Sequence, residues 1–554
     1  MSRSAEVLSP LAMLYKWEQE QPERMYLRQP INGEWMTYNW ARIGDEVRRM
    51  AHLLQQKNYE PGSKIAILSK NCVHWVLSDL AIWMAGHVSV PIYPNVTPNT
   101  LRQILEHSGA KLCFVGKLDD WDYLKPGIPN EIDKICFPFY GINDYPNWDE
   151  VLQDVEPLTG NIDYPMDNIC TIMYTSGTTG IPKGVMHSFF NFAYAASNAL
   201  PTLSVGREAV FFSYLPMCHI AERLLIEMGS LYAGGQVSFA ESLDTFPANL
   251  AETQPTVFLA VPRIWAKFQE KILEKMPQNK LDLLLRIPII NGVVKKKIKA
   301  GLGLTKATNI FSGAAPISVE LINWFGKIGV QIQQAYAMTE DACYSHVNVK
   351  ERDKIGTVGE ALPEVDVRIS QEGEIQIKHK ALMKGYYKEE GMTAEVFTPD
   401  GYFKTGDKGE RDAAGYLRIT GRVKDLFKTS KGKYVAPAPI EMKLMDDHDI
   451  EQACVVGLGL PQPIALITLS ETGAKKTERE LEHGIREVMY RINEQLDSFE
   501  KLKSTIIVRE QWTIDNGLMT PTMKIKRSDI EKIYQDYYQQ WYDAKEDILW
   551  EEVR

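Results

Sequence analysis

The sequence is poor in cysteine, and its cysteines are not arranged in pairs. Only 7 of the 554 residues are cysteine, and no C-x-x-C spacing occurs among them. Several of these cysteines lie inside apolar runs. We therefore expect buried free thiols in a reducing compartment rather than a framework of disulfide bonds.

The sequence also lacks a long uninterrupted apolar run. Its most apolar segment, residues 80–96, is broken by His87 and Pro91, which favours a buried helix followed by a strand over a membrane span. Residues 1–24 contain acidic residues and no long apolar core, which argues against a secretory signal. The net charge of -10 argues against a general nucleic-acid-binding protein. We expect a cytoplasmic protein without a nucleic-acid partner.

The length and the hydrophobic pattern predict a multidomain α/β protein. A chain of 554 residues is too long for one hydrophobic core. Helical and strand patterns alternate along it, which is typical of α/β layering. Helices are expected at residues 40–56, 74–85, 188–200 and 220–232, and strands at residues 64–68, 111–115, 169–174, 209–214 and 236–239.

A domain boundary is expected late in the chain. A strand-like stretch, residues 415–420, runs into Gly421-Arg422-Val423-Lys424-Asp425 and then into a basic segment at residues 428–433. The remaining residues are about the right number for a small separate domain. We therefore expect an N-terminal domain of residues 1–423 and a C-terminal domain of residues 424–554.

A loop rich in glycine and hydroxyl groups follows the strand expected at residues 169–174. Glycines allow backbone N–H groups to turn toward an anion, hydroxyls add neutral donors, and a lysine supplies charge. The loop predicts a phosphate site made by Thr175, Ser176, Gly177, Thr178, Thr179, Gly180 and Lys183. A Walker P-loop is excluded, because Pro182 replaces its second glycine and Gly184 replaces the hydroxyl after the lysine. An ordinary surface turn is the alternative, but about ten specified positions in one run argue against chance.

Residues 175–184 resemble the nucleotide loop T-S-G-T-T-G-x-P-K-G of the acyl-adenylate-forming superfamily, which contains acyl-CoA synthetases, firefly-type luciferases and peptide-synthetase adenylation domains. Three further motifs follow in the order that this superfamily uses: S-G-A-A-P at 312–316, Q-A-Y-A-M-T-E at 334–340 and Y-F-K-T-G-D at 402–407. The resemblance covers residues 35–527 and leaves 528–554 unplaced. It implies a large N-terminal domain of layered α/β sheets and a small, mobile α+β C-terminal domain.

The resemblance implies a set of nucleotide contacts. Gly313 and Ala314 would lie beside the adenine, Tyr336 would stack on it, and Gln334 would bind its edge, with Ala335 in the same site. An aromatic face suits a flat base.

The same resemblance implies that Thr339 contacts the α-phosphate of ATP and that Glu340 binds the Mg²⁺ ion. It also implies that Asp407 and Arg422 contact the ribose. A hard carboxylate suits magnesium that bridges ATP oxygens. Taken alone, a Thr-Glu pair or an aspartate in a glycine turn is an ordinary structural feature.

The resemblance gives Lys524 the catalytic role and Lys424 the role of a hinge. Attack of a carboxylate on the α-phosphorus of ATP crowds negative charge on the oxygens around phosphorus, and a mobile ammonium offsets it. Other branches of the superfamily have glycine before this lysine, where the present chain has Met523. Lys526 therefore stays an alternative to Lys524, and a solvated basic stripe is the ordinary interpretation of both.

Four segments are similar to the long-chain acyl-CoA synthetase branch, namely residues 215–223, 261–265, 428–437 and 520–527. The similarity places His219 near the acyl carboxylate and gives Trp265 the role of a gate to an acyl tunnel. A capping histidine and a core tryptophan are the alternatives. Gly313 would border the acyl pocket. Ala337 replaces a family glycine that also lines this pocket, and its additional methyl group would narrow the mouth of the pocket. The length of the acyl chain is therefore left open.

Residues 280–299 are apolar and basic together. They would suit an anionic membrane surface where fatty acids partition, and a buried segment with a solvated basic end is the alternative.

Together, the motifs predict a fatty-acid–CoA ligase that uses ATP and Mg²⁺ and takes coenzyme A as co-substrate. An acyl-AMP ligase that loads an acyl carrier protein is a rival from the same superfamily. A non-catalytic scaffold is disfavoured, because Lys183, Glu340, Asp407, Arg422 and Lys524 are all present. A homodimer and a peripheral contact with the inner face of the membrane are left open.

Overall fold

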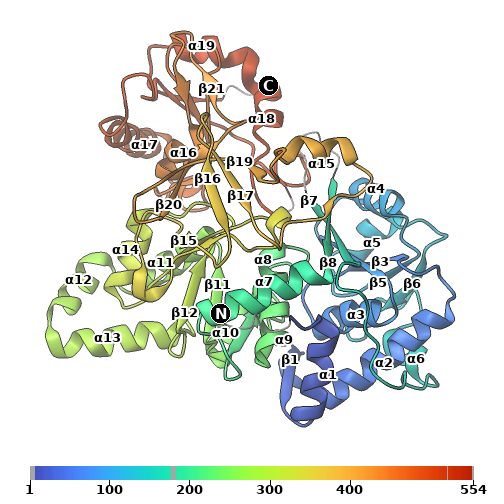
Figure 1. Cartoon of the computed structure of the whole chain (residues 1–554). Helices are drawn as coiled ribbons and strands as arrows, with labels where there is room; N and C mark the ends of the chain where they lie inside the picture. The colour runs from blue at the N-terminus through green and yellow to red at the C-terminus, as the bar shows by residue number, and fades with distance from the viewer. Residues whose placement is uncertain (1–6, 176–181, 521, 552–554) are drawn as a thin grey trace. The chain divides into compact units, whose positions relative to one another are not determined.

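The computed structural model describes residues 7–175, 182–520 and 522–551. They fold into two compact units (Figure 1). The first comprises residues 1–315, 320–366 and 378–403, and the second comprises residues 316–319, 367–377 and 404–554. The expected fold class, a large α/β N-terminal part and a smaller C-terminal part, is confirmed. The boundary expected between residues 423 and 424 divides the chain differently and stays a prediction.

The first unit contains a nine-stranded sheet. Its order is β15 (Glu360–Ala361), β14 (His346–Val347), β13 (Gln333–Tyr336), β12 (Asn309–Ser312), β11 (Val257–Ala260), β9 (Val210–Ser213), β10 (Gln236–Phe239), β1 (Met25–Ile31) and β2 (Glu34–Asn39). The six central strands from β13 to β1 are parallel, and β2, β14 and β15 run antiparallel to their neighbours. Parallel strands place their carboxyl ends at one edge, where α/β proteins bind ligands.

A second sheet of the same unit has seven strands. Its order is β18 (Gly385–Tyr386), β8 (Lys183–Ser188), β7 (Ile169–Thr175), β4 (Val88–Ile92), β3 (Lys64–Leu68), β5 (Leu112–Val115) and β6 (Asp133–Cys136). Strand β8 is antiparallel to β7, so the predicted phosphate loop joins two hairpin strands.

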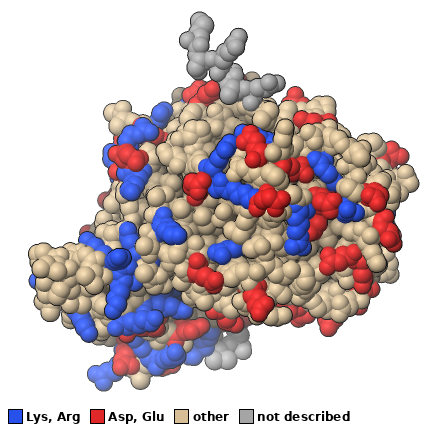
Figure 2. Space-filling view, turned by 90° about the horizontal axis from the view of Figure 1, so that it is seen from below, with Lys and Arg blue, Asp and Glu red and all other residues tan. Residues whose placement is uncertain are grey.

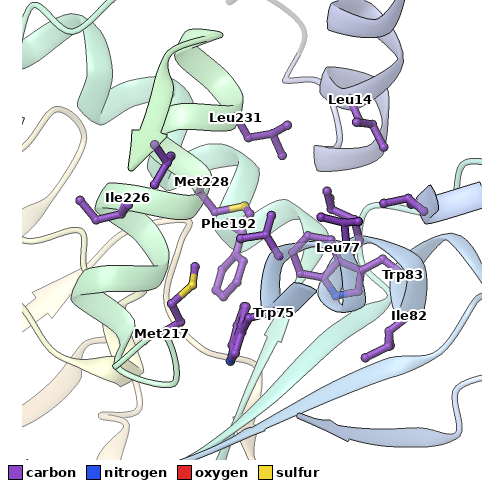
Figure 3. Packing of buried hydrophobic residues seen from close by; sticks show 14 of the residues in the cluster. Leu14, Trp75, Leu77, Ile82, Trp83, Phe192, Met217, Ile226, Met228 and Leu231 are labelled. Carbon is purple, nitrogen blue, oxygen red and sulfur yellow. The ribbon is translucent and has the colours of Figure 1, made fainter. Parts of the chain in front are cut away.

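The larger helices of the first unit are α1 (Pro10–Glu20), α2 (Trp40–Gln56), α3 (Val73–Met84), α4 (Pro98–Ser108), α7 (Phe189–Thr202), α10 (Phe246–Thr253), α11 (Pro262–Lys275), α12 (Gln278–Arg286) and α13 (Pro288–Gly301). Helix α14 (Val319–Lys327) also belongs to these larger helices, and the short helices are α5 (Trp121–Leu124), α6 (Trp148–Leu152), α8 (Ile220–Glu222), α9 (Gly229–Ala233) and α15 (Glu390–Val396). Leu14 of α1, Trp75 and Trp83 of α3, and Phe192 of α7 share one apolar core (Figure 3). Apart from the segments that are not described, no helix is long and apolar enough to span a bilayer.

The second unit contains the sheet β16 (Asp366–Ile369), β17 (Glu374–Lys378), β19 (Phe403–Arg411) and β20 (Leu417–Arg422), and the hairpin β21 (Phe427–Lys428) and β22 (Tyr434–Val435). A further sheet has the order β23 (Ile450–Val456), β24 (Ile464–Leu469), β25 (Thr505–Ile507) and β26 (Ile548–Trp550). Its helices are α16 (Pro437–Leu444), α17 (Glu478–Asn493), α18 (Arg527–Tyr534) and α19 (Tyr538–Asp543).

Alternating apolar residues cover both faces of the β23–β26 sheet. Val455 and Ile467 pack with residues of α16 and α17, whereas Cys454 and Leu466 pack with residues of α18 and α19. Neighbouring strand residues point to opposite faces, so a continuous apolar run fits a sheet covered on both sides.

The elements expected from the hydrophobic pattern agree closely with the structure. The expected helix 40–56 and strand 64–68 match α2 and β3, and the segment 80–96 is the end of α3 followed by β4. The expected helix 220–232 contains a π-helix, η2 (Arg223–Met228), between α8 and α9. All seven cysteines are free, and six of them are buried, as predicted.

Candidate active site

Four predicted site segments lie at the carboxyl ends of neighbouring parallel strands. The His219 segment follows β9, Trp265 follows β11, Gly313 directly follows β12, and Tyr336 ends β13. Since these strands are adjacent in the sheet, the fold gathers segments that are more than 100 residues apart in the sequence.

The phosphate loop is framed by β7 and β8. Thr175 and Lys183 are paired residues of the two strands. Ser176, Gly177, Thr178, Thr179 and Gly180 lie outside the described residues. No helix follows the loop directly, because β8 begins at Lys183, which agrees with the exclusion of a Walker P-loop.

Tyr386 connects the predicted phosphate lysine to the predicted metal ligand. The Lys183 ammonium lies 5.4 Å from the centre of the Tyr386 ring, a cation–π distance. The Tyr386 hydroxyl donates to Glu340 Oε1 at 2.9 Å. Burial and the nearby carboxylate hold the pKa of Tyr386 well above its ordinary value, so this hydroxyl keeps its proton. Lys183 and Glu340 are thus brought to one place by a residue that the motifs did not include.

The turn that carries Thr339 and Glu340 is held from two sides. His187 Nε2 of β8 donates to the Thr339 carbonyl oxygen at 2.7 Å. Burial lowers the pKa of His187 to about 4, so the ring is neutral at pH 7. Asp341 is fully buried and accepts from the backbone N–H of Met338 at 3.0 Å. The first contact ties the backbone of the turn to β8, and the second stabilises the turn internally.

The predicted adenine-binding residues lie on β13 or directly after β12. A methyl group added at Gly313 would lie 3.5 Å from the Ala335 carbonyl oxygen, so the two segments are in close contact. Gln334 Oε1 is buried and has no hydrogen-bond partner among the described residues. Ala314 is exposed and has a left-handed backbone (φ 66°), and the Tyr336 and His346 ring centres are 6.1 Å apart.

His219 caps the short helix α8. Its Nδ1 accepts from the Ala221 backbone N–H at 3.2 Å. The neutral ring therefore carries its proton on Nε2. The capping interpretation is confirmed, and a role beside an acyl carboxylate stays a prediction.

The Glu-Arg pair after His219 is structural. Arg223 is fully buried, with Nη2 bonded to Asp79, Nη1 2.7 Å from Thr171 Oγ1, and Nε 3.3 Å from Glu227. Its guanidinium lies 5.2 Å from the centre of the Phe192 ring, in the core drawn in Figure 3. Two carboxylates face one cation, and burial raises the pKa of Glu227 well above its ordinary value. Burial thus favours the neutral form of Glu227, which lessens the repulsion between the two carboxyl groups.

Glu222, the last residue of α8, connects this helix to β9 and to the loop after it. Its Oε1 accepts from Ser213 Oγ at 2.8 Å, the Tyr214 N–H at 3.0 Å and Asn71 Nδ2 at 3.2 Å. The carboxyl group is buried. Because Glu222 lies three residues after His219, this network fixes the direction in which the His219 loop leaves the sheet.

Replacing Glu222 by glutamine is expected to remove a pH-dependent loss of stability. Burial raises the pKa of Glu222 from 4.5 to about 8, so between these values the folded protein holds a proton that the unfolded chain releases. The free energy of unfolding of the wild type therefore falls as pH rises from about 5 to 8 through this residue. Glutamine keeps the acceptor oxygen and does not titrate. In urea unfolding, the stability of the variant relative to wild type should increase over this range. A difference independent of pH would contradict the raised pKa.

Trp265 lies in an aromatic cluster. Its side chain is fully buried, and its ring centre lies 5.7 Å from Phe258, 5.8 Å from Phe268 and 5.1 Å from Phe325. These contacts support the core interpretation, and the gate role stays a prediction. Ala337 is half-buried just beyond β13.

In the second unit, Asp407 and Arg422 face each other on neighbouring strands. They are paired residues of β19 and β20, and Arg422 Nε lies 2.9 Å from Asp407 Oδ1. The Asp407 side chain is 14% exposed and the Arg422 side chain is 58% exposed. Lys424 follows in an exposed turn between β20 and β21.

Lys524 lies on a short hairpin in which Met519 and Ile525 are bridged. Its backbone N–H donates to Thr520 Oγ1 at 3.1 Å, and its side chain is exposed, whereas Lys526 is half-buried and caps α18. Met523 has a left-handed backbone with φ 61°. A glycine meets this conformation without steric cost, which explains physically why glycine suits the position before the lysine.

Arg527 and Glu441 anchor this hairpin and were not identified from the sequence. Arg527 Nη2 binds both carboxylate oxygens of Glu441 at 2.6 and 2.8 Å, and Nη1 donates to the Val455 carbonyl oxygen at 2.8 Å. Hydrogen bonds between charged groups are stronger than those between neutral groups, so this largely buried ion pair holds the hairpin firmly. Tyr386 and His187 were also not identified from the sequence. Each acts by binding a residue of the Thr339–Glu340 turn that is far away in the sequence, and no local sequence pattern marks such a residue.

Comparisons with known proteins agree with this arrangement. The model of the AMP-binding enzyme family matches residues 14–387, and that of the AMP-binding enzyme C-terminal domain matches residues 424–546. The chain is 29% identical to the long-chain-fatty-acid–CoA ligase FadD15 of Mycobacterium bovis, covering 94% of this chain and 96% of that protein. It is 28% identical to long chain acyl-CoA synthetase 5 of Arabidopsis thaliana, covering 93% and 88%.

Solved structures show the same fold at lower identity. The adenylation domain of a carboxylate reductase from Mycobacterium chelonae superposes with a TM-score of 0.82 at 20% identity, covering 98% of this chain and 92% of that domain. ATP-bound MatB from Rhodopseudomonas palustris gives a TM-score of 0.75 at 22% identity, covering 96% and 100%.

Proposed function

Because the chain belongs to the AMP-binding enzyme family, we propose that this adenylate-forming enzyme activates a fatty acid with ATP and transfers the acyl group to coenzyme A. The adenylation step is supported chiefly by the Lys183–Tyr386–Glu340 arrangement, which joins a phosphate-binding cation to a metal-binding carboxylate. The fatty-acid substrate is supported by similarity to two enzymes whose names specify long-chain acids.

The residues present fit a bound adenine nucleotide. The partnerless buried oxygen of Gln334 is an acceptor, and the adenine amino group is a donor that would satisfy it. Tyr336 offers an aromatic face next to this residue. Asp407, paired with Arg422, offers carboxylate oxygens for the ribose hydroxyls.

A magnesium ion at Glu340 would take most of its ligands from the nucleotide. No cluster of three or more His, Cys, Asp or Glu side chains within the described ranges could hold a metal alone. Magnesium in phosphate-transfer sites commonly binds one or two carboxylates together with phosphate oxygens and water. When bound, the ion would neutralise phosphate charge, and Tyr386 would keep Glu340 oriented toward it.

Each remaining residue has a defined task in the proposed reaction. Thr339 would donate to the α-phosphate, and Lys524 would offset the charge that builds up around the α-phosphorus as the carboxylate attacks. His219 would donate its Nε2 proton in a hydrogen bond to the fatty-acid carboxylate, because its Nδ1 is used by Ala221. Residues after Lys424 would change orientation before the thiol of coenzyme A attacks the acyl carbonyl and AMP leaves.

The decisive experiment measures pyrophosphate release over acids from acetate to oleate. We expect the highest kcat/KM with medium to long fatty acids, and thioester formation with coenzyme A rather than with an acyl carrier protein. Maximal activity on acetate or on an aromatic acid would overturn the fatty-acid assignment and leave adenylation in place. Acyl transfer only to a carrier protein would overturn the CoA step.

Replacing Tyr386 by phenylalanine is expected to lower adenylation about 10- to 100-fold at low magnesium, the scale for losing a hydrogen bond to a charged group. The change removes only the hydroxyl that binds Glu340 and keeps the ring beneath Lys183. Pyrophosphate release should therefore need a higher Mg²⁺ concentration. The neighbouring Tyr387→Phe serves as the matched control. An equal loss at all Mg²⁺ concentrations would contradict a role through Glu340.

A further inference from the structure

Helices α12 and α13 form a hairpin with an exposed apolar end, which we call the apolar tip. It consists of Leu283, Ile287, Ile289, Ile290 and Val293, whose exposed fractions are 61%, 40%, 86%, 37% and 61%. These residues span the end of α12 and the start of α13, and the two helices are joined through the single residue Ile287. No other run of eleven described residues exposes as many large apolar side chains.

The structure contradicts one of the two interpretations of residues 280–299, that of a buried segment. Within the hairpin only Leu281 and Val294 are buried. The segment is therefore a projecting surface and not a part of the core, so its apolar residues need another explanation. Contiguous exposed apolar side chains mark a contact surface.

Cations far outnumber acids on the hairpin that carries the apolar tip. The hairpin carries Lys280, Arg286, Lys295, Lys296, Lys297 and Lys299, against Asp282 as its one acid between residues 278 and 299. This local excess of cations stands on a chain of net charge -10. Figure 2 shows the hairpin as a tan lobe at the left with Lys and Arg beside it. Charge and apolar surface therefore occur together, at a place where the rest of the chain is acidic overall.

We propose that the apolar tip and its basic flanks dock on a lipid bilayer with anionic headgroups. Aliphatic residues inserted about 5–10 Å into the headgroup boundary, with lysines above them, are the pattern of interfacial helices. Each Lys or Arg near an anionic leaflet adds attraction.

Two other occupants fit the surface less well. Protein interfaces are enriched in aromatic residues and depleted in lysine, whereas residues 278–299 contain no aromatic residue and several lysines. A symmetric contact with a second copy would place the same cations against each other. The composition of the hairpin thus favours lipid.

Vesicle flotation tests the proposal with the purified full-length chain and no substrate, so its result does not depend on the proposed reaction. We expect binding to vesicles of phosphatidylcholine mixed with phosphatidylglycerol and at least about tenfold weaker binding to phosphatidylcholine alone. Ile289→Ser with Val293→Ser should weaken binding to the mixed vesicles about tenfold or more. Lys296→Gln with Lys297→Gln should do the same and should remove the preference for anionic lipid.

Matched control variants test whether the loss of any exposed leucine or lysine weakens vesicle binding, or only changes in the hairpin. Leu243→Ser with Leu458→Ser removes two apolar side chains of similar exposure, 82% and 68%, and Lys306→Gln with Lys475→Gln removes two exposed lysines elsewhere. Both control proteins should bind vesicles as the wild type does. Equal losses in control and hairpin variants, absence of vesicle binding by the wild type, or a dimer that dissociates when the tip is changed would each overturn the proposal. Unchanged thermal melting of the hairpin variants excludes misfolding as the cause.

Discussion

Replacing Lys524 by alanine is expected to lower the rate of acyl-AMP formation about 10²- to 10³-fold, the scale for losing one partner of transition-state charge. Thioester formation from acyl-AMP that is supplied ready-made should stay close to the wild-type rate, because in that step the thiol attacks the acyl carbon and no bond to phosphorus forms. Pyrophosphate release and thioester formation, measured separately, check the two halves.

Lys526→Ala is the matched control for this prediction. Lys526 is half-buried and is the N-cap residue of α18, whereas the Lys524 side chain is exposed. We therefore expect the smaller loss of adenylation from Lys526→Ala. A larger loss from this variant would move the catalytic assignment by two residues. Thermal melting of both proteins shows whether the hairpin is intact.

Replacing Lys424 by proline is expected to preserve acyl-AMP formation and to reduce thioester formation about 100-fold or more, since conformational steps of this kind gate turnover. Lys424 lies in an exposed turn between β20 and β21, and proline fixes φ near about -65°. An enzyme that carries out two steps with one small domain needs a residue whose torsions change between them. Proline should therefore hold one orientation.

Lys424→Ala distinguishes the backbone effect from loss of the charge. It should leave both half-reactions near the wild-type rate. If proline reduced both halves equally, misfolding or a hinge elsewhere would be indicated, and the assignment of Lys424 would be wrong.

The sequence was most informative where periodicity and short motifs carry the signal. Strands such as β3 and helices such as α2 were predicted to the residue because each buries one continuous apolar set. The side-chain partners of Arg223 could not be predicted from the sequence. It lies in a recognisable motif, yet its partners Asp79 and Thr171 come from α3 and β7, and only the folded chain brings them together.

Tyr386 illustrates the same limit for the candidate site. It acts on Glu340 across 46 residues of sequence, and a Gly-Tyr-Tyr sequence has many ordinary uses. The tail beyond residue 527 was unplaced because its apolar residues have no clear period. In the structure they supply α18, α19 and the strand β26.

Strand β26 constrains the order in which the second unit becomes complete during synthesis. The strand pairs with β25 in parallel, and Asp547 just before it binds Arg486 at 2.9 Å and Tyr490 at 2.6 Å on α17. Until residues 547–550 leave the ribosome, the outer edge of β25 is unpaired and α17 lacks these two contacts. An unpaired edge is a template for misassociation. A nascent chain whose residues 547–550 are still inside the ribosome should therefore depend more on chaperones than a chain in which these residues have emerged.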